Sequence, residues 1–246
     1  MSSNRRTSSL KNRILSSVAA RHLRKARSLI GIAAVLALLA APAQAQDEDE
    51  QLWLKAGASA QLRAGVELKL ETNQRFGNDR GGIYESQYLF AAAFEIAEGV
   101  TVTAGVNRVV GFTEGKVDYT EWRPRQQIDF SVAKIGSGDL AGRVRIEQRL
   151  RSDDGEPGHT VRPAVSYTIP LRGEWEFELA HESYFNLNGT DNQDTGHERM
   201  RNSAALSFPI GDRLKGEVGY LNQYRFNRDE ADLMEHALTT SLQIEF

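Results

Sequence analysis

Residues 234–246, MEHALTTSLQIEF, decide the fold, because apolar and polar side chains alternate through this segment. One face of an extended chain would carry Met234, His236, Leu238, Thr240, Leu242, Ile244 and Phe246. The other face would carry Glu235, Ala237, Thr239, Ser241, Gln243 and Glu245. A period of two indicates a β-strand with two unlike faces, whereas an amphipathic helix repeats every 3.6 residues.

The same alternation recurs upstream and predicts an all-β protein. Together with the terminal segment it gives ten strands, at about 66–75, 84–96, 100–107, 122–132, 140–150, 161–169, 175–182, 200–208, 214–225 and 234–246. The mean hydropathy is −0.46, and no apolar run after residue 45 approaches the length of a membrane helix. A membrane protein with so polar an average must be a barrel, in which only alternate residues face lipid.

The connections alternate in length as well. Tight turns are expected at 97–99, 136–138, 172–173 and 211–213, and longer polar loops at 77–82, 111–121, 151–159, 187–196 and 226–233. Short turns on one side and long loops on the other are typical of outer-membrane barrels. We therefore expect a transmembrane, antiparallel, up-and-down β-barrel of ten strands over 66–246, with both termini in the periplasm and twelve strands as the alternative. The weakly alternating segment 52–60 is assigned to a periplasmic amino-terminal extension, residues 46–65.

The first 45 residues predict a cleaved signal peptide with a helical apolar segment. Basic residues at 21–27 precede an apolar stretch at 29–40 and a small-x-small cleavage site at 43–45. Eight of the 30 basic residues and none of the 33 acidic ones lie in this segment, so the mature chain carries 22 basic residues and a net charge of −11. Such a charge argues against a nucleic-acid partner. The absence of cysteine excludes disulfides and thiolate metal sites, and we expect no cofactor.

Charged side chains on the polar faces are the candidate lining of the lumen. They are Arg123, Arg125, Arg143, Arg145, Glu147, Arg149, Arg162, Glu176, Glu178, Glu182, Arg201 and Glu217. One interpretation is an anion-selective lining or a site for an acidic ligand, which would make the protein a small-solute channel. The favoured interpretation is a structural, mixed-sign ladder, because side chains largely fill barrels of this size and buried charges require partners. We therefore expect a structural or envelope-maintenance role with a charged, largely occluded lumen.

His181 and Ser183 provide the alternative of an enzyme. They share the lipid-facing side of one strand, as in a few outer-membrane lipid A deacylases, and would make the protein a lipid A-modifying hydrolase. A serine nucleophile needs a histidine base and a third group that orients the ring. No acidic residue is identifiable for that role from the sequence, and Glu182 points to the other face. A protein without enzymatic activity is therefore the favoured prediction.

Several segments together resemble the uncharacterised outer-membrane barrel family known as domain of unknown function 2490. They are 51–53 (QLW), 143–149 (RVRIEQR), 181–186 (HESYFN), 219–220 (GY) and 236–246. The resemblance implies a barrel in the outer membrane of a Gram-negative cell envelope and transfers no catalytic residue. This chain departs from the family pattern at Pro163, which removes a donor from the strand ladder and places the pairing of that strand in doubt.

The closing strand also resembles that of bacterial outer-membrane barrels, whose terminal aromatic residue is read by the membrane-assembly machinery. The resemblance implies an insertion signal at Leu242, Ile244 and Phe246. The expected partners are outer-membrane lipid, lipopolysaccharide and, during insertion, that assembly machinery, and the protein is expected to be a monomer.

Overall fold

The computed structural model describes residues 47–227 and 231–246, which form eleven β-strands and no helix. The strands are β1 (Asp47–Arg63), β2 (Val66–Gly77), β3 (Gly82–Ala97), β4 (Val100–Thr113), β5 (Lys116–Ile135), β6 (Gly138–Arg151), β7 (Gly158–Pro170), β8 (Glu176–Asn186), β9 (Gly196–Gly211), β10 (Leu214–Arg225) and β11 (Leu233–Glu245). The predicted signal peptide, residues 1–45, lies outside the described residues. No helix long and apolar enough to cross a membrane occurs in the described part of the chain.

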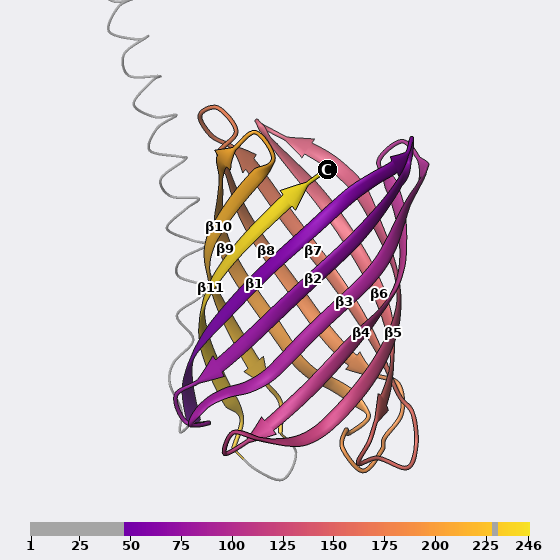
Figure 1. Cartoon of the computed structure of the whole chain (residues 1–246), viewed down its shortest axis with the longest axis vertical. Coiled ribbons are helices and arrows are strands. Elements are labelled where there is room, and N and C mark those ends of the chain that lie inside the picture. Colours follow the sequence, from indigo (N-terminus) through magenta and orange to yellow (C-terminus); the bar gives the residue numbers. More distant parts are fainter. Residues whose placement is uncertain (1–46, 228–230) are drawn as a thin grey trace, which may run out of the picture. The chain divides into compact units, whose positions relative to one another are not determined.

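All eleven strands belong to one closed sheet (Figure 1). Sequential neighbours pair antiparallel, and β1 closes the barrel by pairing with β2 on one side and with β11, in parallel, on the other. Asp47 lies opposite Leu233, and Ser59 opposite Glu245. The prediction of ten strands after an amino-terminal extension is therefore wrong, because most of residues 46–65 form a strand of the barrel. The parallel pair is what allows an odd number of strands to close.

The two mouths of the barrel differ in their connections. The mouth that holds the carboxyl terminus, marked C in Figure 1, carries the turns 64–65, 98–99, 136–137, 171–175 and 212–213. We call it the short-turn mouth. The long-loop mouth carries 78–81, 114–115, 152–157, 187–195 and 226–232, and β1 begins there. The described chain therefore starts and ends at opposite mouths, so the expectation that both termini share one side is wrong. The predicted loop 111–121 is also wrong, because β4 and β5 continue to a turn of two residues, 114–115.

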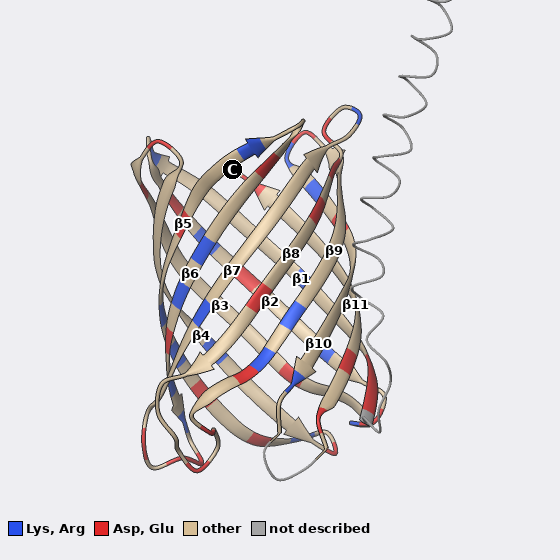
Figure 2. Ribbon diagram, turned by 180° about the vertical axis from the view of Figure 1, so that it is seen from behind, with Lys and Arg blue, Asp and Glu red and all other residues tan. Residues whose placement is uncertain are grey.

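Alternation along each strand directs one side chain outward and the next inward. The large exposed side chains on the outer face are mostly apolar, whereas most buried inward ones are polar. On β3, Phe90 is 52% exposed, whereas its neighbours Leu89 and Ala91 are 6% and 0% exposed. On β11, Leu238 is 53% exposed and Glu235 is fully buried. Charged positions repeat along the strands themselves as well as in the connections (Figure 2). The predicted assignment of apolar residues to the outer face is confirmed, and this arrangement is the reverse of a water-soluble barrel with an apolar core.

Candidate functional site

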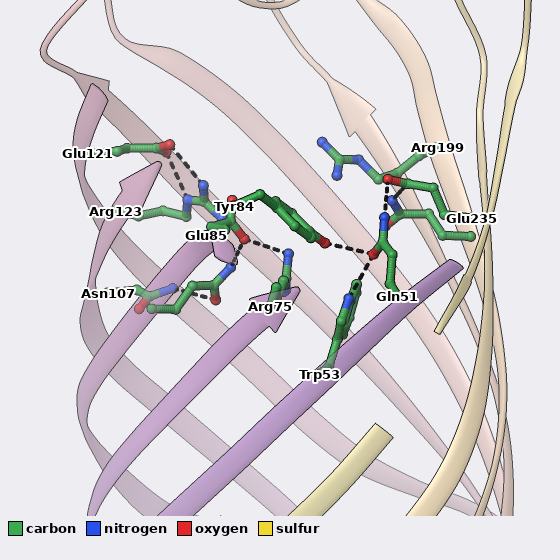
Figure 3. A network of polar contacts seen from close by, with 12 residues as sticks. Gln51, Trp53, Arg75, Tyr84, Glu85, Asn107, Glu121, Arg123, Arg199 and Glu235 are labelled. Carbon is green, nitrogen blue, oxygen red and sulfur yellow. Dashed lines mark hydrogen bonds and ion pairs between the residues drawn. The ribbon is translucent and has the colours of Figure 1, made fainter. Parts of the chain in front are cut away.

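A ring of polar side chains crosses the lumen in the half nearer the long-loop mouth, and we call it the girdle. Its members are Gln51, Trp53, Arg75, Glu85, Glu121, Arg123, Glu147, Arg162, Glu182, Tyr184, Arg201, Gln223 and Glu235. Figure 3 shows part of it, with side chains from opposite sides of the barrel directed toward one another. The girdle forms because ten of the eleven strands, all but β4, place a long side chain inward at nearly the same level.

One arm of the girdle is a chain of alternating charges along β5 to β8. Arg123 donates two hydrogen bonds of 2.8 Å to Glu121 and lies 3.9 Å from Glu147. Arg162 then bridges Glu147 at 2.7 Å and Glu182 at 2.8 Å. Glu121 is fully buried and Glu147 is 3% exposed. Carboxylates buried to this degree persist in the ionised form only when cations and hydrogen-bond donors surround them.

The other arm of the girdle runs from β3 through β1 to β11, and neutral side-chain amides lie between its charged groups. Gln51 donates to Glu235 at 2.7 Å, and its oxygen accepts from the indole of Trp53 at 2.8 Å and from the hydroxyl of Tyr84 at 2.7 Å. Glu235 also accepts from Arg225 at 2.7 Å. Each buried acceptor in this arm therefore has at least one donor, as a stable interior requires.

Arginine planes stacked on aromatic rings connect the arms. Arg75 lies 3.9 Å from the ring centre of Trp53, and Arg162 lies 4.1 Å from that of Tyr184. Arg201 lies 4.9 Å from Trp53 and 4.8 Å from Tyr184, two rings carried by β1 and β8. Because three strands separate β1 from β8, Arg201 joins residues that are not neighbours in the sheet. The girdle therefore narrows the lumen.

The remaining interior is a cavity of about 910 Å³. Its lining reaches Asp118 and Asn192 near the long-loop mouth and Lys69 and Asp129 in the opposite half, so one cavity runs past the girdle. Of the predicted lumen residues, the lining includes Arg123, Arg125, Arg143, Arg145, Glu147, Arg149, Arg162, Glu178, Glu182 and Arg201, and does not include Glu176 and Glu217. Fourteen lysines and arginines line the cavity against eight aspartates and glutamates.

An arginine cluster, formed by Arg125, Arg143 and Arg145, concentrates this excess of positive charge on the short-turn side of the girdle. Arg143 pairs with Glu182 at 2.6 Å, and Arg145 lies 3.6 Å from Glu147, which Arg162 already holds. Arg125 forms no ion pair with any carboxylate in the described ranges, and its buried Nε has no hydrogen-bond partner there. Cationic side chains with so few anionic partners make this part of the lumen attractive to anions.

His181 and Ser183 lie on the outer face of β8, as predicted, and the structure brings Asn202 of β9 to them. His181 Nε2 lies 3.2 Å from Ser183 Oγ, and His181 Nδ1 lies 2.8 Å from Asn202 Oδ1. His181 and Asn202 are cross-strand partners in the β8–β9 ladder. An amide oxygen only accepts, so this geometry requires the proton on Nδ1 and leaves Nε2 as an acceptor toward the serine.

A family model described as "Protein of unknown function (DUF2490)" matches residues 50–234. The chain belongs to the DUF2490 family. An uncharacterized protein of Methylorubrum extorquens is 26% identical over 220 residues, which cover 87% of this chain and 96% of that protein. The predicted family resemblance is thus confirmed.

Among solved structures, this DUF2490 barrel is similar to an anion-selective porin from Comamonas acidovorans. The TM-score is 0.34 and the identity 9%, with 71% of this chain and 55% of the porin chain covered. The chain therefore spans about half of the length of that porin. A likeness of this strength carries no argument about solute or selectivity.

Two loops of the DUF2490 barrel, 152–157 and 187–195, are joined at the long-loop mouth. Asp154 accepts a short hydrogen bond from the Thr190 hydroxyl and a weaker one from Asn192. The bond from Thr190 is the main reason that the pKa of Asp154 falls to about 2. Hydrogen bonds from Arg151 lower the pKa of the neighbouring Asp153 as well. No group of three or more acidic, histidine or cysteine residues suited to a metal ion occurs in the described part of the chain.

Sequence reasoning missed Asn202, the neutral members of the girdle and also Glu121, which it placed in the predicted loop 111–121. Asn202 could have been found by pairing the predicted strands across the 187–196 loop, since this pairing sets it opposite His181. Gln51 and Trp53 were missed because their segment was assigned to an extension outside the barrel. The prediction that Pro163 disturbs the pairing of its strand is confirmed, because the β7–β8 ladder is interrupted between the pairs Val161–Phe185 and Ala164–Glu182.

Proposed function

We propose that this protein is an outer-membrane β-barrel whose narrowed lumen passes small anions slowly and excludes larger solutes. The long-loop mouth would face the exterior and the short-turn mouth the periplasm. The apolar outer face and the unequal connections at the two mouths support this placement.

The observation that carries the proposal is the net positive lining of the cavity, fourteen cationic side chains against eight anionic ones. Glu121 and Glu235 lie behind the lining and pair with its arginines, yet the cationic excess persists with both included. Walls of low dielectric focus such a charge along the lumen, so anions gain and cations lose free energy on entry. The girdle sets the upper limit on solute size, because its side chains contact one another across the lumen.

The test is electrical recording on the refolded mature protein in a planar bilayer. Small conductance steps are expected. Under a potassium chloride gradient, the sign of the reversal potential should show that chloride is more permeant than potassium. Replacing Arg125 and Arg145 together by glutamine should reduce the anion preference, because both line the cavity and few carboxylates oppose them. Arg108→Gln is the matched control, since this arginine stacks on the outward-facing Trp122 at 4.8 Å.

Heat-modifiable gel mobility establishes that each variant is folded before it is recorded. A folded barrel that stays electrically silent, or that prefers cations, contradicts the proposal. The absence of any conductance from folded protein would instead support a purely structural, envelope-maintenance role for the closed barrel.

A further inference from the structure

The outer face of β8 and β9 holds three polar side chains, with apolar residues beside them on β7 and, toward the short-turn mouth, on β8. His181, Ser183 and Asn202 form one hydrogen-bonded chain there, and Val165, the cross-strand partner of His181 on β7, is 43% exposed on the same face. A polar group that faces hydrocarbon costs free energy even when it is hydrogen-bonded, so polar residues at such positions are commonly functional. The lumen proposal leaves this cluster without a role.

We propose that Ser183, His181 and Asn202 form a catalytic site that hydrolyses acyl esters of membrane lipids. His181 Nε2 is within hydrogen-bond distance of Ser183 Oγ, as a general base must be. Asn202 accepts from Nδ1–H and fixes both the tautomer and the ring orientation. Asn202 is therefore a positioning residue, in the place that an aspartate or asparagine takes in other serine and cysteine hydrolases.

The depth of the site matches the position of lipid ester bonds. Toward the long-loop mouth, His197 packs between Phe185 at 4.6 Å and Phe226 at 4.5 Å, which is the kind of aromatic belt that marks a membrane interface. Toward the short-turn mouth the outer face of β8 continues with Leu179 and Phe177. The serine thus lies between the aromatic belt and the apolar band, where the ester linkages join headgroups to acyl chains.

Cross-strand partners of Asn202 continue a row of polar residues on the outer face from β9 to β1. Asn202 pairs with Asn222 of β10, and Asn222 with His236 of β11. His236 Nδ1 lies 2.6 Å from the hydroxyl of Tyr220. The row ends at Glu50 of β1, near the long-loop mouth. Barrel strands are tilted, so this row of polar residues runs obliquely toward the long-loop mouth, and it places Ser183 at the edge of the apolar band that faces that mouth.

The backbone around Ser183 is irregular on both sides. The β7–β8 ladder lacks the pairs that would join Arg162 and Pro163 to Tyr184 and Ser183. On the other side, the β8–β9 register shifts between Tyr184 and Phe185. The gap on the β7 side follows from Pro163, which has no backbone donor, whereas the shift on the β9 side is a bulge. Bulges are over-represented beside active sites, where they redirect side chains.

The reaction requires only lipid and water. The Ser183 hydroxyl gives its proton to His181 Nε2 as Oγ bonds to the ester carbonyl carbon. The carbon–oxygen bond to the lipid alcohol then breaks, and His181 returns the proton to the departing oxygen. Water then attacks the carbonyl carbon of the acyl-serine and gives its proton to His181 Nε2. The bond between that carbon and Ser183 Oγ breaks, and His181 returns the proton to Oγ, which releases the fatty acid and restores the serine. Asn202 keeps His181 aligned through both halves of the reaction.

The experiment uses refolded mature protein in two arms, phospholipid vesicles and purified lipopolysaccharide, with released fatty acid measured by mass spectrometry. Release is expected in at least one arm, and the arm identifies the lipid. Ser183→Ala and His181→Ala should each lower the rate by about 10³-fold or more. His236→Ala, another outward histidine that bonds a tyrosine instead of a serine, is the matched control and should keep the full rate.

A fluorophosphonate probe provides a second readout that does not depend on the choice of lipid. It should attach to Ser183 in the unmutated protein and fail to attach in His181→Ala. Asn202→Leu should lower the rate at least about tenfold, whereas Asn202→Asp should keep activity and move the acid limb of the pH profile upward, because a carboxylate stabilises the protonated imidazole. Folded protein that neither releases fatty acid nor reacts with the probe overturns the proposal, as does release that survives Ser183→Ala.

Discussion

Replacing Arg162 by methionine should destabilise the barrel more than any comparable change in the arginine cluster. Arg162 donates to Glu147 at 2.7 Å, to Glu182 at 2.8 Å and to the Tyr184 hydroxyl at 2.6 Å. Methionine keeps the unbranched stem of the side chain but leaves two carboxylates, Glu147 and Glu182, which are 3% and 8% exposed, without their shortest or second-shortest cationic contact. Removing one partner of a buried ion pair costs about 3–5 kcal/mol.

The lower end of that range applies, because other arginines remain near both carboxylates. Arg145 lies 3.6 Å and Arg123 3.9 Å from Glu147, and Arg143 keeps its contact of 2.6 Å with Glu182. We therefore expect a loss of about 3 kcal/mol in the free energy of unfolding. Arg143→Met removes one ion pair of a side chain that is 31% exposed, and should cost only about 1 kcal/mol.

Urea unfolding in lipid vesicles measures both values. Fluorescence of Trp53, recorded with Trp122 and Trp175 replaced by phenylalanine, reports on the girdle directly, since Arg75 stacks on its ring at 3.9 Å. With a denaturant slope of about 3 kcal/mol per M, the midpoint should fall by roughly 1 M for Arg162→Met and by roughly 0.3 M for Arg143→Met. Equal midpoints for the two variants would refute the view that Arg162 is the central cation of the girdle.

Three further outcomes follow from the barrel. In the orientation proposed above, a tag placed before Asp47 should be accessible from outside intact cells and a tag after Phe246 should not, because the parallel pair puts the two ends at opposite mouths; equal accessibility would contradict the topology. The pKa of Asp154 is lowered from 3.8 to about 2, so its hydrogen bond to Thr190 should persist above pH 3.8 and be lost as the pH falls through about 2. Hydrogen exchange of the β8–β9 loop, corrected for intrinsic exchange rates, measures this loss. Exchange that is unchanged between pH 4 and 1.5 would contradict the prediction. Gly105→Ala should reduce the yield of heat-modifiable barrel, since its Cβ would lie 2.7 Å from the Phe90 carbonyl oxygen, whereas Gly155→Ala, which meets nothing within 4 Å, should not.

Most of the sheet could be predicted because a period of two fixes the two faces of a strand without any knowledge of its neighbours. Phe90 and Leu238 lie outward and Glu235 inward as the alternation required. Side chains that act across strands could not be predicted in the same way, because their proximity depends on register. Asn202 meets His181 only because the β8–β9 ladder pairs these two positions, and a shift of one residue would send Asn202 into the lumen.

The strand count failed for a different physical reason. Residues 52–60 alternate, but small residues such as Ala56 and Ala58 make the apolar face weak, and an even number of strands was required to bring both termini to one mouth. Hairpin geometry imposes no such parity, since an odd barrel closes wherever its first and last strands can pair in parallel. Here the pairing extends to the last residue, because the Phe246 amide donates to the Ser59 carbonyl at 2.9 Å. The terminal strand that revealed the fold is therefore also one side of the seam that closes it, and the barrel cannot close before β1 has joined β11.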